Sequence, residues 1–318
     1  MPLFDWRDVD GALLSDAWVE QRSRWSQNLF WETEANWAQV EAERRAGRLP
    51  GMVLMEGRTV AAWSFFLLHQ NTLQIGGFES SSSSATRRLL DGVLETADPE
   101  LAPSGAMLFA FSGAPGLVPA LVARGFDTEP YEYLVREMAG VRPMRPEHEW
   151  DLSAAAQLPS LLARAYGPPT LTRPFARHGS MDEWREYAAQ LLGSQACGAF
   201  EPALSAASFR SDGTLDGAIV TTIIGPGTAH IAQVAVDPTR RGTGLAGQML
   251  ASVIERARAD RFERVSLLVS ERNTTARRLY AHSGFHEAAS FIAAGRGAHQ
   301  ELRASMLDSG TRAPALRL

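Results

Sequence analysis

The spacing of apolar positions in the first half of the chain predicts two helices followed by strands and further helices. Apolar residues recur at helical intervals in some segments, whereas runs of β-branched and aromatic residues mark strands in others. Helices are expected over 16–26, 32–45, 85–97 and a short segment that ends near 124–126. Strands are expected over 52–55, 59–69, 72–78 and 106–111. Glu56-Gly57 marks a hairpin turn between the first two strands.

The same order of elements recurs in the second half. Helices are expected over 154–166, 181–192, 245–259 and 274–282, and strands over 202–209, 215–224, 228–236 and 264–270. Equivalent landmarks keep a near-constant offset, which is 156 residues from Gly57 to Gly213 and 159 residues from Gly125 to Gly284. This repeat predicts a duplication with two related lobes of one α/β fold. The expected domains are 1–140 and 151–318, joined by a Pro-rich linker over 141–150.

Composition and charge narrow the class of protein. The 318 residues include 45% hydrophobic and 21% charged residues, which are ordinary values for a packed globular chain. The net charge of -5 gives no electrostatic footprint for a polyanion, so neither nucleic acid nor a membrane is an expected partner. All the basic residues are arginine, which excludes nucleoside triphosphatases whose phosphate loop needs a lysine.

Cysteine usage and the first residues bear on the compartment. The single cysteine, Cys197, rules out an internal disulfide and a Cys-rich metal site, and we expect no metal. The start of the chain carries early acids and no apolar stretch behind a basic one, which argues against a secretory signal. No run approaches the roughly 18 apolar residues of a membrane helix. A cytoplasmic protein is expected, either a monomer or a homodimer.

The segment 230–250 carries the densest chemical signal. A buried strand runs to Val236, a short turn follows, and Gly242-Thr243-Gly244 opens a helix. A helix N-terminus presents free backbone N–H groups and the positive end of the helix dipole, which together favour phosphate. Glycines remove the Cβ atoms that would keep an anion away, while Arg240 and Arg241 add positive potential. This pattern predicts a pyrophosphate site.

Two ligands fit such a site, a dinucleotide and coenzyme A. Gly242, Gly244 and Gly247 match the dinucleotide fingerprint, but the first glycine of that motif lies in the turn directly after the strand, and here five residues intervene. The motif also follows a hairpin series, whereas a dinucleotide domain has successive parallel βαβ units. A dinucleotide-dependent oxidoreductase remains an alternative to a CoA enzyme.

Two sequence blocks resemble the GNAT superfamily of N-acetyltransferases. The run Arg241-Gly242-Thr243-Gly244-Leu245-Ala246 matches the acyl-CoA loop of that family, which has Gln or Arg first, Gly fourth and Gly or Ala sixth. The segment 264–285 resembles the following block, a strand and then a helix that carries Asn273 and Tyr280 and ends at Gly284-Phe285. The resemblance implies an α+β architecture in which each lobe is a mixed, mostly antiparallel sheet flanked by helices.

The resemblance also implies roles for individual residues. Tyr280 would be the general acid that protonates the departing CoA thiolate. Asn273 would bond the pantetheine arm, and 234–236 would offer backbone groups to it where the strand splays from its neighbour. The implied cofactor-binding residues are Val234, Ala235, Val236, Arg241, Gly242, Thr243, Gly244, Leu245, Ala246, Asn273 and Arg277.

An amine acceptor must also lose a proton, so a general base is required. His230 begins the strand where some family members carry a glutamate base, and regular alternation would place it on one face with Val234 and Val236. Glu201 and Glu271 are the other candidates.

The resemblance implies a substrate between the loop that joins the first two helices, here 167–178, and the last strands, here the region 295–297. Arg173 and Arg177 in that loop would receive an acidic group of the acceptor. Neither residue selects one substrate.

The first lobe lacks the glycine turn. Glu79 and the five serines over 80–84 stand at the equivalent positions, so this lobe is expected to be degenerate and without activity. The prediction for the whole chain is an acetyl-CoA-dependent N-acetyltransferase that acetylates a primary amine of a small molecule by direct transfer in a ternary complex. A non-catalytic acyl-CoA sensor or scaffold and a mycothiol-synthase-like acetylation of a sugar-linked cysteine amine are the alternatives.

Overall fold

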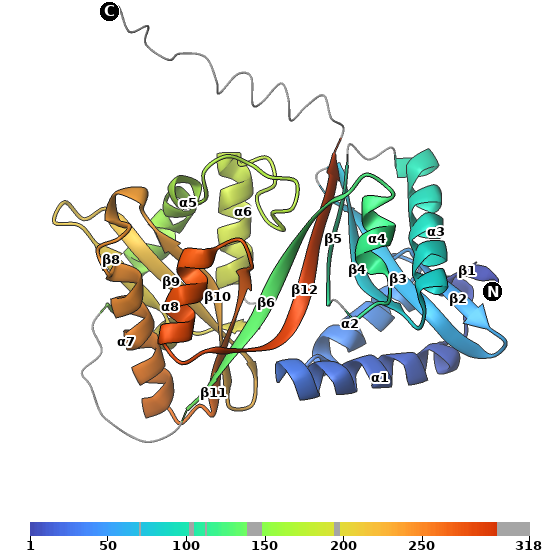
Figure 1. Ribbon diagram of the computed structural model, residues 1–318, viewed down its shortest axis with the longest axis horizontal. Coiled ribbons are helices and arrows are strands. Elements are labelled where there is room, and N and C mark those ends of the chain that lie inside the picture. The colour runs from blue at the N-terminus through green and yellow to red at the C-terminus, as the bar shows by residue number, and fades with distance from the viewer. Residues whose placement is uncertain (70, 102–104, 112, 139–147, 194–197, 298–318) are drawn as a thin grey trace, which may run out of the picture.

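The computed structural model describes the whole chain except residues 70, 102–104, 112, 139–147, 194–197 and 298–318. Cys197, most of the expected linker and the end of the second expected domain therefore lie outside the described residues. Helices flank a mixed, mostly antiparallel sheet in both halves of the molecule (Figure 1), so the fold class predicted from the sequence is confirmed.

The first half contains every helix and strand that the apolar pattern predicts. Its elements are β1 (Leu3–Asp5), η1 (Trp6–Asp8), α1 (Gly11–Leu29), α2 (Glu34–Arg45), β2 (Gly51–Glu56), β3 (Thr59–His69), β4 (Thr72–Ser80), α3 (Ser83–Leu101), β5 (Gly105–Phe111), α4 (Leu117–Val122) and β6 (Asp127–Glu137). The long strand β6 was not predicted. It contains Pro130, a residue that argues against an interior strand in a sequence pattern.

The second half repeats this order. Its elements are α5 (Leu152–Tyr166), α6 (Met181–Leu192), β7 (Ala199–Phe200), η2 (Pro202–Leu204), β8 (Ala206–Phe209), β9 (Leu215–Gly225), β10 (Thr228–Val236), η3 (Pro238–Arg240), α7 (Leu245–Ala259), β11 (Arg264–Ser270), α8 (Thr274–His282) and β12 (His286–Gly297). The strand expected over 202–209 begins instead as the 3-10 helix η2, because the Glu201 side chain caps it through the backbone N–H of Ala203.

The two halves share one sheet because their last strands are exchanged. The strand order is β1-β2-β3-β4-β5-β12-β6-β11-β10-β9-β7, with β8 paired to β9. Strand β12, from the end of the second half, pairs with β5, while β6, from the first half, pairs with β11. The two exchanged strands pair with each other and cross the middle of the molecule side by side (Figure 1). Each half therefore completes the sheet of the other.

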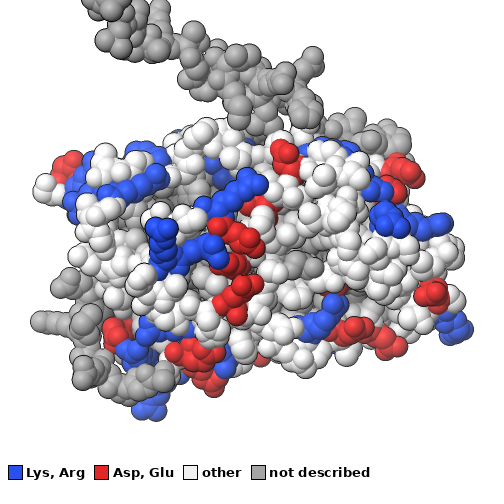
Figure 2. Space-filling model, in the orientation of Figure 1, with Lys and Arg blue, Asp and Glu red and all other residues white. Residues whose placement is uncertain are grey.

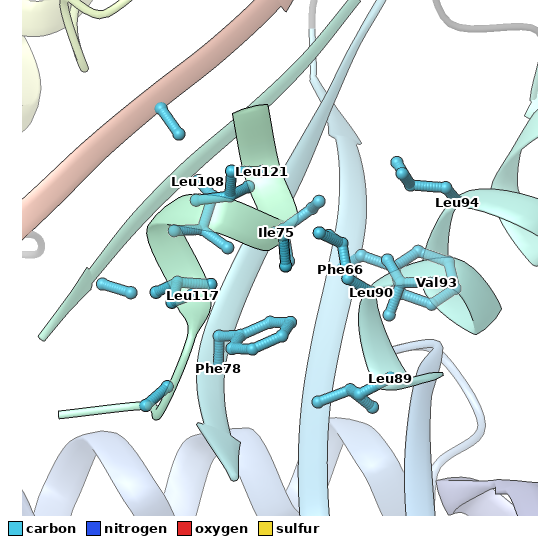
Figure 3. Packing of buried hydrophobic residues seen from close by; sticks show 14 of the residues in the cluster. Phe66, Ile75, Phe78, Leu89, Leu90, Val93, Leu94, Leu108, Leu117 and Leu121 are labelled. Carbon is cyan, nitrogen blue, oxygen red and sulfur yellow. The ribbon is translucent and has the colours of Figure 1, made fainter. Parts of the chain in front are cut away.

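Helices cover both faces of this sheet. In the second half, α7 and α8 share one apolar cluster with β10 and β11, whereas α5 and α6 pack on the opposite face. In the first half, α3 and α4 cover one face, and Phe66, Ile75 and Phe78 of the strands point toward Leu90 and Leu121 of these helices (Figure 3). Burial of each such side chain contributes about 1.5–3 kcal/mol, so these clusters dominate the stability of the fold.

The same opening occurs between two parallel strands in each half. Strands β4 and β5 pair only over Thr72–Ile75 and Gly105–Leu108. Strands β10 and β11 pair only over Thr228–Ile231 and Arg264–Leu267. Beyond these four residue pairs the strands separate, which leaves a V-shaped gap in the sheet.

The surface does not favour a polyanion on the face that Figure 2 shows, where basic and acidic side chains are interspersed among neutral ones. Within the described part of the chain, the helices fall short of the length and hydropathy that crossing a membrane would require.

Candidate active site

A cavity of about 1150 Å³ opens where β10 and β11 separate. Its lining comes from both halves of the molecule: β3, β4, β5 and β6 from the first, and α5, α6, β10, β11, α8 and the start of α7 from the second. On its far side β10 stays paired with β9 as far as Val236, and β11 stays paired with β6. Strand β10 therefore turns one unpaired edge toward the cavity.

A β-bulge changes which side chains of β10 share a face. The register against β9 shifts between Ile231 and Gln233. Because the shift breaks the two-residue alternation, Val234 and Val236 pack with the α7 cluster, whereas Ala232 and Ala235 pack with the α5 and α6 cluster. The expectation that His230 shares a face with Val234 and Val236 is wrong for this reason.

The glycine turn before α7 is exposed and uncrowded. Gly242 and Gly244 have φ of 75° and 84°, and an added Cβ at either position would meet no atom within 4 Å. Helix α7 begins directly after Gly244, and no side chain in the described part of the chain caps its first N–H groups. Residues 240–244 are exposed, and most of the turn lines the cavity. The turn therefore has room for an anion at a bare helix N-terminus.

Asp237 anchors this turn, a role that the sequence pattern did not predict. Its buried carboxylate accepts hydrogen bonds from the backbone N–H of Thr239 at 3.0 Å and from the Thr239 hydroxyl at 2.7 Å. It also pairs with Arg164 at 2.8 Å and Arg210 at 2.9 Å. The hydrogen bonds from Thr239 and Arg164 hold the pKa of Asp237 far below its usual range. Asp237 thus stays ionised and keeps the turn in one shape.

The arginines of the turn have protein partners of their own. Arg241 donates to the carbonyl of Ala165 at 2.6 Å, and Arg240 pairs with the buried Asp216 at 3.1 Å. Thr243 donates its hydroxyl to the carbonyl of Arg240 at 2.8 Å. Side-chain contacts therefore shape the turn, while its amides and glycines form the surface that faces the cavity.

Tyr280 and Asn273 both line the cavity from α8. Asn273 is the N-cap of α8 and accepts from the backbone N–H of Ala276 at 3.1 Å. Tyr280 is 6% exposed and packs edge-on against Phe285. Burial raises the pKa of Tyr280 well above its ordinary value. Among the described residues, its hydroxyl has no recorded hydrogen-bond partner, and it is available to a ligand.

A second tyrosine, Tyr166, lines the same cavity, and no sequence motif predicted it there. Its hydroxyl donates to the carbonyl of Val234 at 3.3 Å and accepts from the amide of Gln233. Gln233 in turn accepts from the hydroxyl of Tyr187 at 2.7 Å. Burial raises the pKa of Tyr166 to about 12. This chain of hydrogen bonds holds the bulge of β10 against α5 and α6, a contact that only the bulge makes possible.

Arg277 does not reach the cavity. Its guanidinium donates to the Glu132 carboxylate of β6 through Nε at 2.8 Å and through a second, shorter bond. This pairing raises the pKa of Arg277. The expected cofactor contact of Arg277 does not fit this geometry, because a carboxylate from the exchanged strand takes up the side chain.

His230 is surrounded by aromatic rings. It is 2% exposed, stacks on Tyr133 at 6.0 Å, lies 5.5 Å from Trp31 and places Nδ1 2.9 Å from the Ser266 hydroxyl. Burial lowers the pKa of His230 to about 4. Such an imidazole is neutral near pH 7 but holds a proton weakly, which disfavours it as the base.

The other two candidate bases, Glu201 and Glu271, lie away from the cavity lining. Glu201 caps η2, and Glu271 lies in the exposed turn after β11. Neither carboxylate is placed to take a proton from an acceptor in the cavity.

The two arginines of the loop 167–178 differ in whether they line the cavity. Arg173 is 6% exposed, donates through all three guanidinium nitrogens to carbonyls of Pro168, Phe175 and Ala176, and lies over the Trp184 ring. The expected substrate contact of Arg173 does not fit this geometry, because the guanidinium is bonded to its own loop and does not line the cavity.

Arg177 does line the cavity. It donates through one nitrogen to the carbonyl of Arg296 at 2.6 Å, while its other terminal nitrogen, Nη1, is buried with no partner among the described residues. Burial lowers the pKa of Arg177.

A histidine–carboxylate pair in the same loop was also missed. Glu183, at the start of α6, is 8% exposed and accepts from the backbone N–H groups of His178 and Ser180 at 3.0 Å each. It also lies 2.8 Å from Nδ1 of His178. Burial opposes ionisation of Glu183, but these hydrogen bonds prevail and lower its pKa. Since an ionised carboxylate only accepts, Nδ1 of His178 carries the proton and Nε2 is an acceptor.

The equivalent region of the first half is closed by its own side chains. Glu79 is 8% exposed and accepts from Gln21 at 2.6 Å and from Arg24 at 2.7 Å. At the start of α3, the Ser82 hydroxyl accepts from the backbone N–H of Ala85. Trp63 and Phe65 lie so close to Gly77 that an added Cβ would come within 2.7 Å of both. These contacts favour the expectation that this lobe is degenerate.

Comparisons with known proteins agree with this geometry. Residues 164–285 match the sequence profile of the acetyltransferase (GNAT) family. A search of curated proteins gives no match. Solved structures with the same fold include a GCN5-related N-acetyltransferase from Sphaerobacter thermophilus, with 17% identity, a TM-score of 0.57 and coverage of 78% of this chain and 80% of that one.

Two further structures share the fold at low identity. A tandem GNAT protein from the clavulanic acid biosynthesis pathway has 15% identity, a TM-score of 0.50 and coverage of 80% of this chain and 84% of its own. A GCN5-related glucosamine N-acetyltransferase region of a fungal multi-domain enzyme has 12% identity, a TM-score of 0.59 and coverage of 92% of this chain and 38% of its own. The segment 164–285 is therefore similar to the GNAT family of acetyltransferases, and the chain shares the fold of these solved structures.

Proposed function

We propose that the protein is an acetyl-CoA-dependent N-acetyltransferase that acetylates the primary amine of a small molecule by direct transfer. One observation carries this proposal: the bare glycine turn, the unpaired edge of β10 and the Tyr280 side chain all line one cavity. The turn would bind the phosphates of such a thioester, the strand edge would bind its extended arm, and the tyrosine would protonate its leaving sulfur.

The cofactor would occupy the part of the cavity between the turn and β11. The turn Arg241–Ala246 would bind the pyrophosphate through backbone N–H groups at the start of α7. The edge of β10 over 234–236 would hydrogen-bond the pantetheine arm in the manner of an added strand. Bound there, acetyl-CoA supplies an activated acetyl group to the centre of the cavity.

Tyr280 is the proposed general acid. In the transfer the acceptor nitrogen forms a bond to the acetyl carbon, the bond from that carbon to sulfur breaks, and sulfur takes a proton from the Tyr280 hydroxyl. Because burial raises its pKa, the Tyr280 hydroxyl is protonated near pH 7, so the proton is present when the thiolate leaves. The proton lost by the amine returns to Tyr280 through solvent by way of a base.

His178 is the proposed base in place of His230. Glu183 holds the His178 ring by Nδ1 and leaves Nε2 as an acceptor on the cavity lining. A carboxylate that orients an imidazole and stabilises its protonated form recurs in many enzymes that use histidine as a base. His178 would take the amine proton directly or through one water molecule.

Free thiol release tests the proposal. The full chain is incubated with acetyl-CoA and a panel of primary amines, and CoA thiol and acetylated product are measured together. We expect equal amounts of thiol and N-acetyl product. Binding of acetyl-CoA without turnover of any amine would favour a sensor or scaffold, and binding of NADH with no affinity for CoA would favour a dinucleotide enzyme. Selective turnover of a sugar-linked cysteine amine would favour the mycothiol-synthase-like reaction.

A further inference from the structure

We propose that the acceptor is a primary amine on a flat, apolar body, and that its binding site lies between the two halves with one wall supplied by the first half. This inference rests on the proposed function. It gives the first half a role in acceptor selection, although that half has no glycine turn.

The first half contributes part of the cavity wall. The contributing side chains are Leu67, His69, Thr72, Gln74, Met107, Phe109 and Tyr131. They come from neighbouring strands β3, β4 and β5 and from the exchanged strand β6. Leu67 is 41% exposed, so an apolar surface is open there and not filled by the protein. This wall lies beyond β11, away from the glycine turn, where an acceptor would meet the acetyl group.

Aromatic rings give this part of the cavity its character. Phe109 and Tyr131 meet edge to face at 5.7 Å on the strands of the sheet. Phe175 and Tyr187 stack at 4.4 Å with an interplanar angle of 7° on the loop and helix α6. All four rings line the cavity. Faces of aromatic rings favour flat apolar groups through burial and stacking.

Charges around the rings favour a cationic end on the ligand. Glu183 and Glu186 line the cavity from α6. Glu186 lies 3.1 Å from Nε2 of His69 on β3, and this contact joins the two halves. The described lining residues from the loop and α6 include these two carboxylates and one arginine, Arg177, so negative charge exceeds arginine charge here. An ammonium group is therefore better accommodated here than a phosphate or carboxylate.

The apolar side chains of the wall also favour some classes of amine over others. A polyamine would place a second charge among the apolar groups, which costs several kcal/mol unless it is paired. An amino sugar would place several hydroxyl groups there, and each needs a hydrogen bond. An arylalkylamine places its ring on the aromatic groups and its ammonium near the carboxylates.

Phenethylamine, spermidine and glucosamine serve as the three probes, and acetylation is measured with the wild type, with Phe109→Ala and with Phe111→Ala. Phe111 is the matched control, because it lies on the same face of β5 and also contacts Phe291, but it does not line the cavity. We expect phenethylamine to have the highest kcat/KM. We expect Phe109→Ala to raise the KM for phenethylamine about 10-fold, because the ligand loses one aromatic contact. The KM for acetyl-CoA should stay within about 2-fold of the wild-type value.

Calorimetry with CoA, measured alongside, distinguishes failure of this inference from failure of the proposed function. Absence of CoA binding would overturn both. CoA binding with preferred turnover of spermidine or glucosamine would overturn the acceptor class alone. CoA binding with no turnover of any of the three probes would contradict the proposed function as well. An equal change of KM in Phe109→Ala and Phe111→Ala would overturn the role of the first-half wall.

Discussion

The Glu132 carboxylate on β6 accepts a hydrogen bond of 2.8 Å from Nε of Arg277 on α8. Strand β6 belongs to the first half of the chain, whereas α8 carries Tyr280 and is capped by Asn273. The exchange of strands therefore does more than join two sheets, because it places a carboxylate from one half beneath the helix that carries the proposed acid of the other.

Glu132→Gln tests this contact. Glu132 is 8% exposed, and loss of its charge should lower the free energy of unfolding by about 1–3 kcal/mol, as for a hydrogen bond to a charged group. A small displacement of α8 should also lower kcat several-fold. Asp182→Asn is the matched control, since it removes an exposed ion pair with Arg185. Equal stability of the two variants in urea unfolding would refute the role of Glu132.

Tyr280→Phe tests the proposed acid. Removing the hydroxyl should lower kcat by about 100-fold or more, the usual contribution of general acid–base catalysis, while the Kd for acetyl-CoA stays nearly unchanged. Tyr166→Phe is the informative partner, because Tyr166 lines the same cavity and also has a raised pKa. Full activity in Tyr280→Phe together with a large loss in Tyr166→Phe would transfer the acid role to Tyr166.

The histidine–carboxylate pair predicts how two substitutions affect the rate. If His178 accepts the amine proton, His178→Gln should lose most of kcat while the Kd for acetyl-CoA stays nearly unchanged. Glu183→Gln should keep part of the rate, since the amide still bonds the ring but does not stabilise its charge. An unchanged kcat in His178→Gln would exclude this base.

Burial of His230 predicts how the free energy of unfolding changes with pH. Its pKa falls to about 4 in the folded protein because of burial, whereas an unfolded histidine has a pKa of about 6.5. The unfolded state therefore binds more protons between these values, and the free energy of unfolding should decrease as pH falls from 6.5 toward 4. The loss from this group approaches about 3 kcal/mol. His230→Asn should flatten this part of the curve in chemical unfolding, and an identical slope would contradict the burial of a neutral His230.

Local patterns in the sequence predicted most elements but not their pairing. Apolar periodicity located β10 and α7 to the residue, because that signal depends on neighbours in the chain. The exchange of β6 and β12 depends on contacts between segments about 150 residues apart, for which a single sequence gives no signal.

Prediction of the site residues also depends on whether the signal is local in the sequence or arises only on folding. The glycine turn and Tyr280 belong to contiguous motifs, and the structure places both on the cavity. The partners of Arg173 and Arg277 could not be predicted, because these partners, loop carbonyls and Glu132, reach the two arginines only when the chain folds. The bulge at Ala232–Gln233 likewise has no signature in the alternation of apolar residues, and it decided which way the side chains of β10 point.

Calorimetric titration with acetyl-CoA is the most direct test of the glycine turn as a pyrophosphate site. The variant is Thr243→Glu, which adds a negative charge to the exposed turn and keeps both glycines, and Ser211→Glu in the exposed turn before β9 is the control. We expect the wild type and Ser211→Glu to bind with Kd between about 1 μM and 1 mM, the range of common enzyme substrates, and Thr243→Glu to bind at least about 10-fold more weakly. Equal affinity in all three proteins, or no binding to the wild type, would contradict the site.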